Sequence, residues 1–125
     1  MKKVKILVME DDPFNQEVIR DMLTILGDEL GVEINIDIAN DGKEGIDLYD
    51  SNNYDIVLTD MDMPNIKGLD ALKYIKSKNP EKPVIVITAF GLQGDRERFL
   101  AEGFDGYLPK PVDYEELKEV IRKYI

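Results

Sequence analysis

The stretch Tyr54–Gly68, YDIVLTDMDMPNIKG, indicates the fold because it joins a buried strand to a carboxylate. The unbroken apolar run Ile56–Leu58 predicts a strand that is covered on both faces. Asp60 then falls at the carboxyl end of this strand, which is the edge of an open α/β sheet where ligands bind. The alternative is that Asp60 only begins a turn, which Pro64 and Gly68 continue.

Strand patterns alternate with helix patterns on both sides of this stretch. Four more strands are predicted at Val4–Met9, Ile34–Ile38, Val84–Ile87 and Phe104–Leu108. The second of these alternates apolar and polar residues, which is typical of an edge strand, and the last is the weakest. Five strand–helix pairs predict a single (βα)5 domain over residues 1–125, with a doubly wound parallel sheet in the α/β class and helices on both faces.

The first helix has the clearest start signal. Asp12 is a predicted N-cap, and Pro13 occupies the first helical position. Apolar residues then recur at helical spacing and predict a helix that ends near Gly27 or Leu30; they are Phe14, Val18, Met22 and Ile25.

Composition excludes several function classes. The chain has 125 residues, which fits one domain, and it contains no cysteine and no histidine. Disulfides, thiolate or imidazole metal sites and a phosphohistidine on this chain are therefore excluded. The net charge of −10 argues against a nucleic-acid partner and favours a cation. No apolar run approaches the roughly 20 residues of a membrane span, and the N-terminus lacks a signal-peptide core, so we expect a cytoplasmic protein without membrane contact.

Four of the five predicted strands end in a residue with a charged or hydroxyl side chain. Glu10 and Asp11 follow the first strand, Asp60 the third, Thr88 the fourth and Lys110 the fifth. Each has an ordinary explanation by itself, such as an acid at a helix start or a solvated lysine. Because the carboxyl ends of parallel strands share one edge, their common position predicts a single site.

Three carboxylates in one cleft need a counter-charge, since two carboxylates about 5 Å apart repel by ~3 kcal/mol at an effective dielectric near 20. Oxygen ligands without histidine or cysteine favour Mg²⁺ or Mn²⁺. A metal beside Asp60, with Lys110 and Thr88 opposite, forms a site suited to a phosphoryl group. A carboxylate can itself be the nucleophile and form an aspartyl phosphate.

In order and spacing, four segments resemble the receiver domain of two-component response regulators. They are ILVMEDDPFNQ at the first strand, YDIVLTDMDMPNIKGLDAL around Asp60, VIVITAF at the fourth strand and GFDGYLPKPVD at the fifth. The resemblance covers essentially the whole chain and implies the flavodoxin-like strand order 2-1-3-4-5. The Glu-Asp pair followed by Asn15-Gln16 is similar to receivers of hybrid histidine kinases and to single-domain regulators.

The resemblance also implies a role for each site residue. The phospho-acceptor would be Asp60, which takes a phosphoryl group from the phosphohistidine of a partner. The other roles fall on Glu10, Asp11 and the backbone carbonyl of Asp62 as metal ligands with Asp60, on the hydroxyl of Thr88, on Lys110 before a typically cis Pro111, and on the aromatic switch Tyr107.

The implied upstream partner is a histidine kinase or a histidine phosphotransfer protein. Because the chain stops after the fifth predicted helix, we expect a stand-alone receiver that signals to a protein target through the fourth helix, fifth strand and fifth helix. Three features depart from the family pattern: an extra acid at Asp62, a bulky Phe90 and a long segment at Gly27–Ala39. Asp62 and Phe90 would flank the water that hydrolyses the aspartyl phosphate, which predicts a long-lived phosphorylated form.

Two alternatives remain open from the sequence. Asp60-Met61-Asp62 also fits the nucleophile and acid of a phosphatase of the haloacid dehalogenase type, with Thr88 and Lys110 as its later hydroxyl and lysine. Against this, the paired acids here precede the Asp-x-Asp motif, and that family usually places its motif on the first strand. A phosphorylation-dead scaffold is the third possibility, and the intact site positions argue against it.

Overall fold

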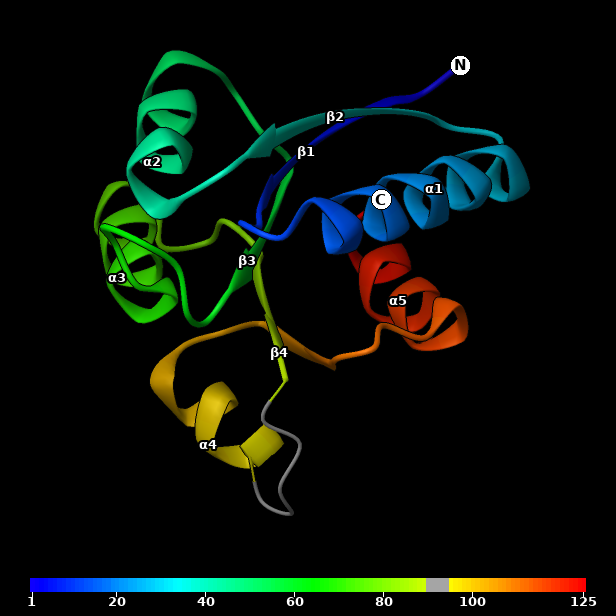
Figure 1. The fold of residues 1–125 in the computed structure, drawn as a ribbon. Helices are drawn as coiled ribbons and strands as arrows, with labels where there is room; N and C mark the ends of the chain where they lie inside the picture. Colours follow the sequence, from blue (N-terminus) through cyan, green and yellow to red (C-terminus); the bar gives the residue numbers. More distant parts are fainter. Residues whose placement is uncertain (90–94) are drawn as a thin grey trace.

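A parallel sheet of five strands in the order β2-β1-β3-β4-β5 forms the centre of the molecule (Figure 1). The structure is a computed structural model that describes residues 1–89 and 95–125. In chain order the elements are β1 (Lys3–Met9), α1 (Pro13–Leu30), β2 (Glu33–Ala39), α2 (Gly42–Ser51), β3 (Ile56–Asp60), α3 (Gly68–Lys78), β4 (Val84–Thr88), α4 (Asp95–Glu102), β5 (Gly106–Pro109), α5 (Tyr114–Ile121) and a final 3₁₀ turn at Arg122–Tyr124. The predicted fold class and strand order are confirmed.

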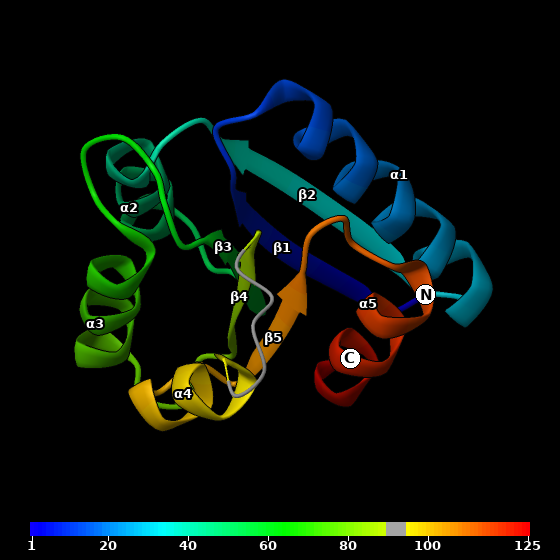
Figure 2. The same cartoon turned by 60° about the horizontal axis from the view of Figure 1, so that its bottom comes forward.

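Helices cover both faces of the sheet and create two apolar cores. α1 and α5 lie side by side on one face, and α2, α3 and α4 lie on the other (Figure 2). Alternate residues of β1 supply the two cores: Ile6 and Val8 pack with α1 and α5, whereas Leu7 and Met9 pack with the three remaining helices. All five residues of β3 are buried, as the uninterrupted apolar run predicts.

The N-cap of α1 is the one that the sequence predicts, whereas its buried face includes only part of the predicted apolar stripe. The Asp12 side chain accepts a hydrogen bond from the Phe14 N–H at 2.9 Å, and Gly31 ends the helix with φ of 69°. The helix has 18 residues, and only Gly31 and Val32 separate it from β2, so the segment Gly27–Ala39 holds no long loop. Of the predicted apolar positions, Met22 packs against the core, whereas Phe14 and Ile25 are 72% and 55% exposed. The fully buried apolar side chains of the helix are those of Ile19, Leu23 and Leu26.

β5 is the shortest strand and begins later than its apolar pattern suggests. Phe104 is buried but precedes the strand, which starts at Gly106 beside Ile85 of β4. A Cβ atom at Gly106 would lie 2.8 Å from Val120 of α5, so the absence of a side chain lets α5 pack close to this strand. Across the described part of the chain, every helix is too short or too polar to cross a membrane.

Candidate functional site

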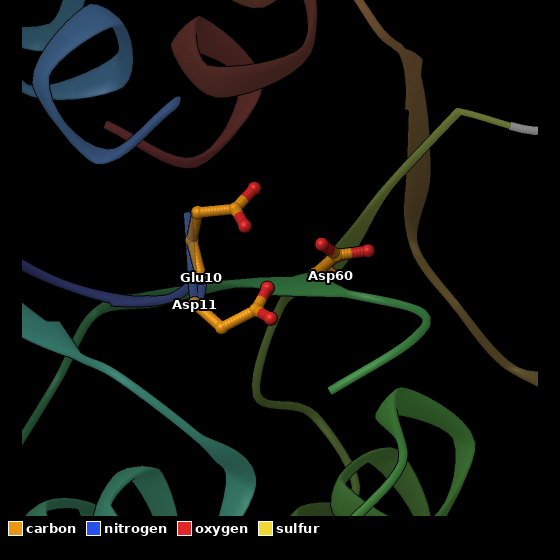
Figure 3. Close-up of side chains that lie close together, drawn as sticks. All are labelled: Glu10, Asp11 and Asp60. Atoms are coloured by element: carbon orange, nitrogen blue, oxygen red, sulfur yellow. The ribbon is translucent and has the colours of Figure 1, made fainter. Parts of the chain in front are cut away.

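Three acids meet where β1 and β3 end. Glu10, Asp11 and Asp60 each offer a carboxylate oxygen, and these oxygens lie within 4.8 Å of one another (Figure 3). Parallel pairing of Met9 with Thr59 sets this register, because the next residue of each strand is Glu10 or Asp60. Glu10 and Asp60 are buried, whereas Asp11 is exposed. The predicted convergence of these acids is therefore confirmed.

Lys110 is the cation that the sequence places at the same edge. It follows β5, and its side chain crosses the end of β4 to place Nζ 2.7 Å from Asp60 Oδ2 and 2.8 Å from Glu10 Oε1. The backbone N–H of Lys110 donates to the Thr88 carbonyl at 2.8 Å, and the bond to Pro111 is cis, as the resemblance implies. Burial lowers the pKa of the Lys110 ammonium, but its contacts to Asp60 and Glu10 outweigh this and raise the pKa above the usual value.

One lysine does not neutralise the site. Burial raises the pKa of Glu10 above 4.5, and this effect prevails over the lowering by Lys110 and by the Asp12 N–H; the nearby Asp60 charge raises it further. Among the residues that the structure describes, Glu10 Oε1 is the buried side-chain oxygen that makes no hydrogen bond of good geometry. The charged form of Glu10 is therefore disfavoured in this arrangement, and a further cation would relieve it.

The backbone around Asp60 needs a glycine on α3. A Cβ atom at Gly68 would lie 2.3 Å from the Asp60 carbonyl oxygen, so only glycine lets α3 begin against the end of β3. The sequence suggested a turn here, but not this close approach. Asp62 is exposed, its N–H donates to Asp60 Oδ1 at 3.3 Å, and its carboxylate lies 4.0 Å from Lys67 Nζ.

The remaining predicted site residues lie on β4 and β5. Thr88 is the last residue of β4 and is 1% exposed, one position beyond the Ile87 that pairs with Asp60. Tyr107 is half-buried on the α4 side of β5, where its ring stacks on Phe99 with 5.5 Å between centroids. Burial and, to a lesser degree, the charges of α4 and α5 raise the pKa of Tyr107. Phe90 lies outside the described residues.

Gln16, which the sequence did not assign to the site, contacts the backbone of Glu10, and Asn40 in turn contacts Gln16. Gln16 donates from Nε2 to the carbonyl of Glu10 at 2.6 Å and to Asn40 Oδ1 at 2.9 Å. The sequence showed the Asn15-Gln16 pair, which is similar to that of other receivers, but it did not indicate a contact with Glu10. Hydrogen bonds of this kind join parts of the chain that are 24 residues apart and leave no local pattern.

Comparison with known proteins agrees with this geometry. Residues 6–122 match the model of the response regulator receiver domain family. The polar-differentiation response regulator DivK of Brucella anthropi is 31% identical over 122 residues, which cover 96% of this chain and 94% of that protein. The crystal structure of response regulator TrrA from Thermotoga maritima, in complex with Mg²⁺-BeF, is 32% identical, covers 100% of both chains and superposes with a TM-score of 0.83.

Other relatives are much longer. Hybrid signal transduction histidine kinase I of Dictyostelium discoideum is 38% identical over 97% of this chain, but the match covers only 7% of the kinase. The family match decides between a receiver domain and a dehalogenase-type phosphatase, because the receiver model covers residues 6–122 and includes the Asp-x-Asp motif. The chain belongs to the response regulator receiver domain family.

Proposed function

We propose that Asp60 is the residue that accepts the phosphoryl group in this receiver domain and that Glu10, Asp11 and Asp60 bind Mg²⁺ for the reaction. The observation that carries the proposal is the meeting of three carboxylates within 4.8 Å beside a single bridging lysine. Mn²⁺ has the same preference for oxygen ligands and is the expected substitute.

The residues present fit a hard divalent cation. All three donors are carboxylates, one of them is exposed to receive water, and a buried oxygen of Glu10 makes no hydrogen bond of good geometry within the described chain. When bound, Mg²⁺ would neutralise the acids and bring the phosphoryl oxygens of the donor to the site. TrrA, which was solved with Mg²⁺ and BeF, supports this assignment by its similarity.

The protein's own contribution is position and charge. An oxygen of the Asp60 carboxylate attacks phosphorus, and the bond from phosphorus to the phosphohistidine nitrogen of the donor breaks. The nitrogen keeps the electron pair of that bond and takes up a proton from solvent. Lys110 already contacts Asp60 Oδ2, so its ammonium is placed to accompany the incoming phosphoryl oxygens. The Thr88 hydroxyl, buried at the neighbouring strand end, is our candidate to hydrogen-bond one of these oxygens. The Asp62 carbonyl remains the predicted backbone ligand of the metal.

The donor must be the phosphohistidine of another protein or a small activated donor such as acetyl phosphate, since this chain has no histidine. Similarity to the receiver regions of histidine kinases supports a histidine kinase or a histidine phosphotransfer protein as the donor. A cytoplasmic site of action is part of the same proposal.

The output surface that we propose is a groove between α4, β5 and α5. Its volume is about 520 Å³, and its lining consists of Arg96, Tyr107, Pro109, Glu115, Glu116, Glu119, Val120 and Lys123. The lining combines apolar groups of Tyr107, Pro109 and Val120 with charges of both signs, namely three glutamates of α5 and the cations Arg96 and Lys123. This combination fits a partner surface that presents an apolar side chain flanked by charged residues of both signs.

Tyr107 is the residue through which we expect phosphorylation to change this groove. If Thr88 moves toward the phosphoryl group, the space behind it can accept the half-buried ring of Tyr107, which would leave the groove lining. A coupling of ~1–3 kcal/mol between the two events would be typical. A Tyr107 ring that stays fixed on Phe99 is the alternative.

Beryllofluoride, which mimics a phosphoryl group, tests both parts of the proposal. Fluorine NMR should detect bound beryllofluoride when Mg²⁺ is present, and Asp60→Asn should abolish the signal. Aromatic NMR on the same sample should show a shifted Tyr107 ring. Absence of the bound fluorine signal in the unmutated protein contradicts the acceptor site, whereas a bound signal with an unchanged Tyr107 contradicts only the output route.

A further inference from the structure

The amide of Gln16 ties the metal-ligand loop to the end of β2. Its Nε2 uses both of its hydrogens, one toward the Glu10 carbonyl at 2.6 Å and one toward Asn40 Oδ1 at 2.9 Å. The N–H of Glu10 donates to the Ala39 carbonyl at 3.0 Å. Both backbone polar groups of Glu10 are therefore fixed, directly or through Gln16, to the two residues where β2 passes into α2.

The carbonyl that Gln16 binds belongs to the peptide unit between Glu10 and Asp11. That unit is planar and rigid, so holding its oxygen sets the direction in which both acids leave the backbone. Glu10 and Asp11 are two of the three carboxylates that converge in the site. One hydrogen bond from Gln16 thus acts on two candidate ligands together.

A chain of polar contacts extends this support across the mouth of the sheet. Asn40 donates to the Glu44 carboxylate at 3.3 Å, and Asp41 accepts from the Glu44 N–H at 2.8 Å. Asp41 also accepts from Asn65 Nδ2 at 3.1 Å, and Asn65 lies in the loop that follows Asp60. The loops after β1, β2 and β3 are therefore connected by side chains.

Asn15, the other member of the pair, supports the next turn of the same loop. Its Nδ2 donates to Asp12 Oδ2 at 3.2 Å, and the Asp12 N–H donates to Glu10 Oε2 at 3.1 Å. Asn15 reaches the carboxylate of Glu10 only through Asp12, and its bond is exposed, whereas the bond from Gln16 to Glu10 is part-buried. Gln16 is the stronger candidate of the two.

We infer that Gln16 is a positioning residue that holds the Glu10–Asp11 peptide in the orientation needed to bind the divalent cation, with Asn40 holding the Gln16 amide in place. The inference deepens the proposed function and depends on it. Outer partners of metal ligands commonly change metal affinity by about 10–100-fold when removed, and a partner of the backbone belongs at the lower end of that range.

Calorimetric titration with Mg²⁺ on the full chain tests this assignment. Gln16→Met keeps the length of the side chain and removes both hydrogen bonds, and it should raise the dissociation constant for Mg²⁺ by about tenfold. Asn40→Ala should raise it less, and the double variant should resemble Gln16→Met, because both residues act through one contact. Thr24→Val is the matched control: it removes a 2.9 Å hydrogen bond to a carbonyl on the same helix, away from the site, and should leave Mg²⁺ binding unchanged.

Phosphorylation by acetyl phosphate provides a second readout. Gln16→Met should be slow at low Mg²⁺ and should approach the unmutated rate at saturating Mg²⁺, because the ligands remain and only their orientation is weakened. A Mg²⁺ dissociation constant within twofold of the unmutated value, or a rate defect that saturating Mg²⁺ does not correct, overturns the inference. If the unmutated protein binds no Mg²⁺, the proposed function itself fails.

Discussion

Two lysine–carboxylate ion pairs in this molecule have nearly the same length, but the pKa of the carboxyl group is raised in one and lowered in the other. In the site, Lys110 Nζ lies 2.8 Å from Glu10, and between α1 and α5, Lys118 Nζ lies 2.7 Å from Glu29. Hydrogen bonds from Lys118 and then Tyr114 lower the pKa of Glu29, whereas burial raises the pKa of Glu10 despite its lysine. Distance to the cation is therefore not what separates them.

The difference lies in solvent. Glu29 keeps water around it and gains two donors, so its charged form is satisfied and joins two helices. Glu10 has lost its water, and its lysine is shared with Asp60. Removal of water costs an ion more than one shared partner returns, so the site retains an unfavourable negative charge. A phosphoryl site that depends on a cation requires such a charge. The cluster of Glu29, Tyr114 and Lys118, which we call the clamp, only joins α1 to α5 and does not require it.

The largest expected contrast is in metal binding. Glu10→Gln and Asp11→Asn should each weaken Mg²⁺ binding by at least about tenfold, because each removes a charged oxygen ligand. Glu29→Gln removes a carboxylate that lies equally close to a lysine, but it should leave the Mg²⁺ affinity unchanged because Glu29 is not in the acidic cluster. Calorimetry on the three variants measures this directly. Equal effects at Glu10 and Glu29 would mean that the acidic cluster is not the binding site.

The next contrast is in the sign of a stability change. A pKa raised by folding means that the charged carboxylate destabilises the metal-free fold above that pKa and that the cost disappears as the pH falls below it. Glu10→Gln should therefore raise the melting temperature of the metal-free protein at pH near 7, and the gain should shrink toward pH 4.5 and below. Thermal unfolding in EDTA at several pH values tests this. A lowered melting temperature at neutral pH would show that the ion pair with Lys110 outweighs burial.

The smallest effect is expected at the clamp. A lowered pKa means that Glu29 contributes stability above its unfolded pKa and loses it as the pH falls through the folded value. Glu29→Gln should lower the melting temperature at neutral pH by no more than about 2 °C, since exposed ion pairs contribute little and salt screens them. The loss should diminish in high salt. A melting temperature that rises would remove the contrast with Glu10→Gln.

The strand ends were predictable because they depend on local sequence pattern. The environment of each acid was not predictable, because it depends on contacts between distant parts of the chain. Apolar runs that stop at Glu10, Asp60 and Thr88 were sufficient to place these residues at one edge. The clamp joins Glu29 to Tyr114 and Lys118 across separations of 85 and 89 residues, which no periodicity reveals. Sequence pattern therefore located the charges, but only the packing of α1 and α5 and the depth of the site separate a satisfied carboxylate from an unsatisfied one.

The same limit applies within single elements. The apolar spacing from Phe14 to Ile25 indicated a helix correctly, but which apolar residues of the helix face the sheet depends on how α1 packs between β1 and β2 in the chain. Gly68 could be assigned to a turn, whereas its contact with the Asp60 carbonyl depends on how α3 docks. Both features follow from tertiary packing, which local sequence does not encode.

The most direct test of the central claim is phosphorylation of the purified chain by acetyl phosphate, followed by intact mass and peptide mapping. We predict that one phosphoryl group is added when Mg²⁺ is present, that EDTA prevents the addition, and that the modified residue is Asp60. Asp60→Asn should remain unmodified, while Asp62→Asn, which changes an exposed acid two positions away, should still be phosphorylated. A phosphoryl group on the Asp60→Asn protein, or an equal yield in EDTA, would contradict the account.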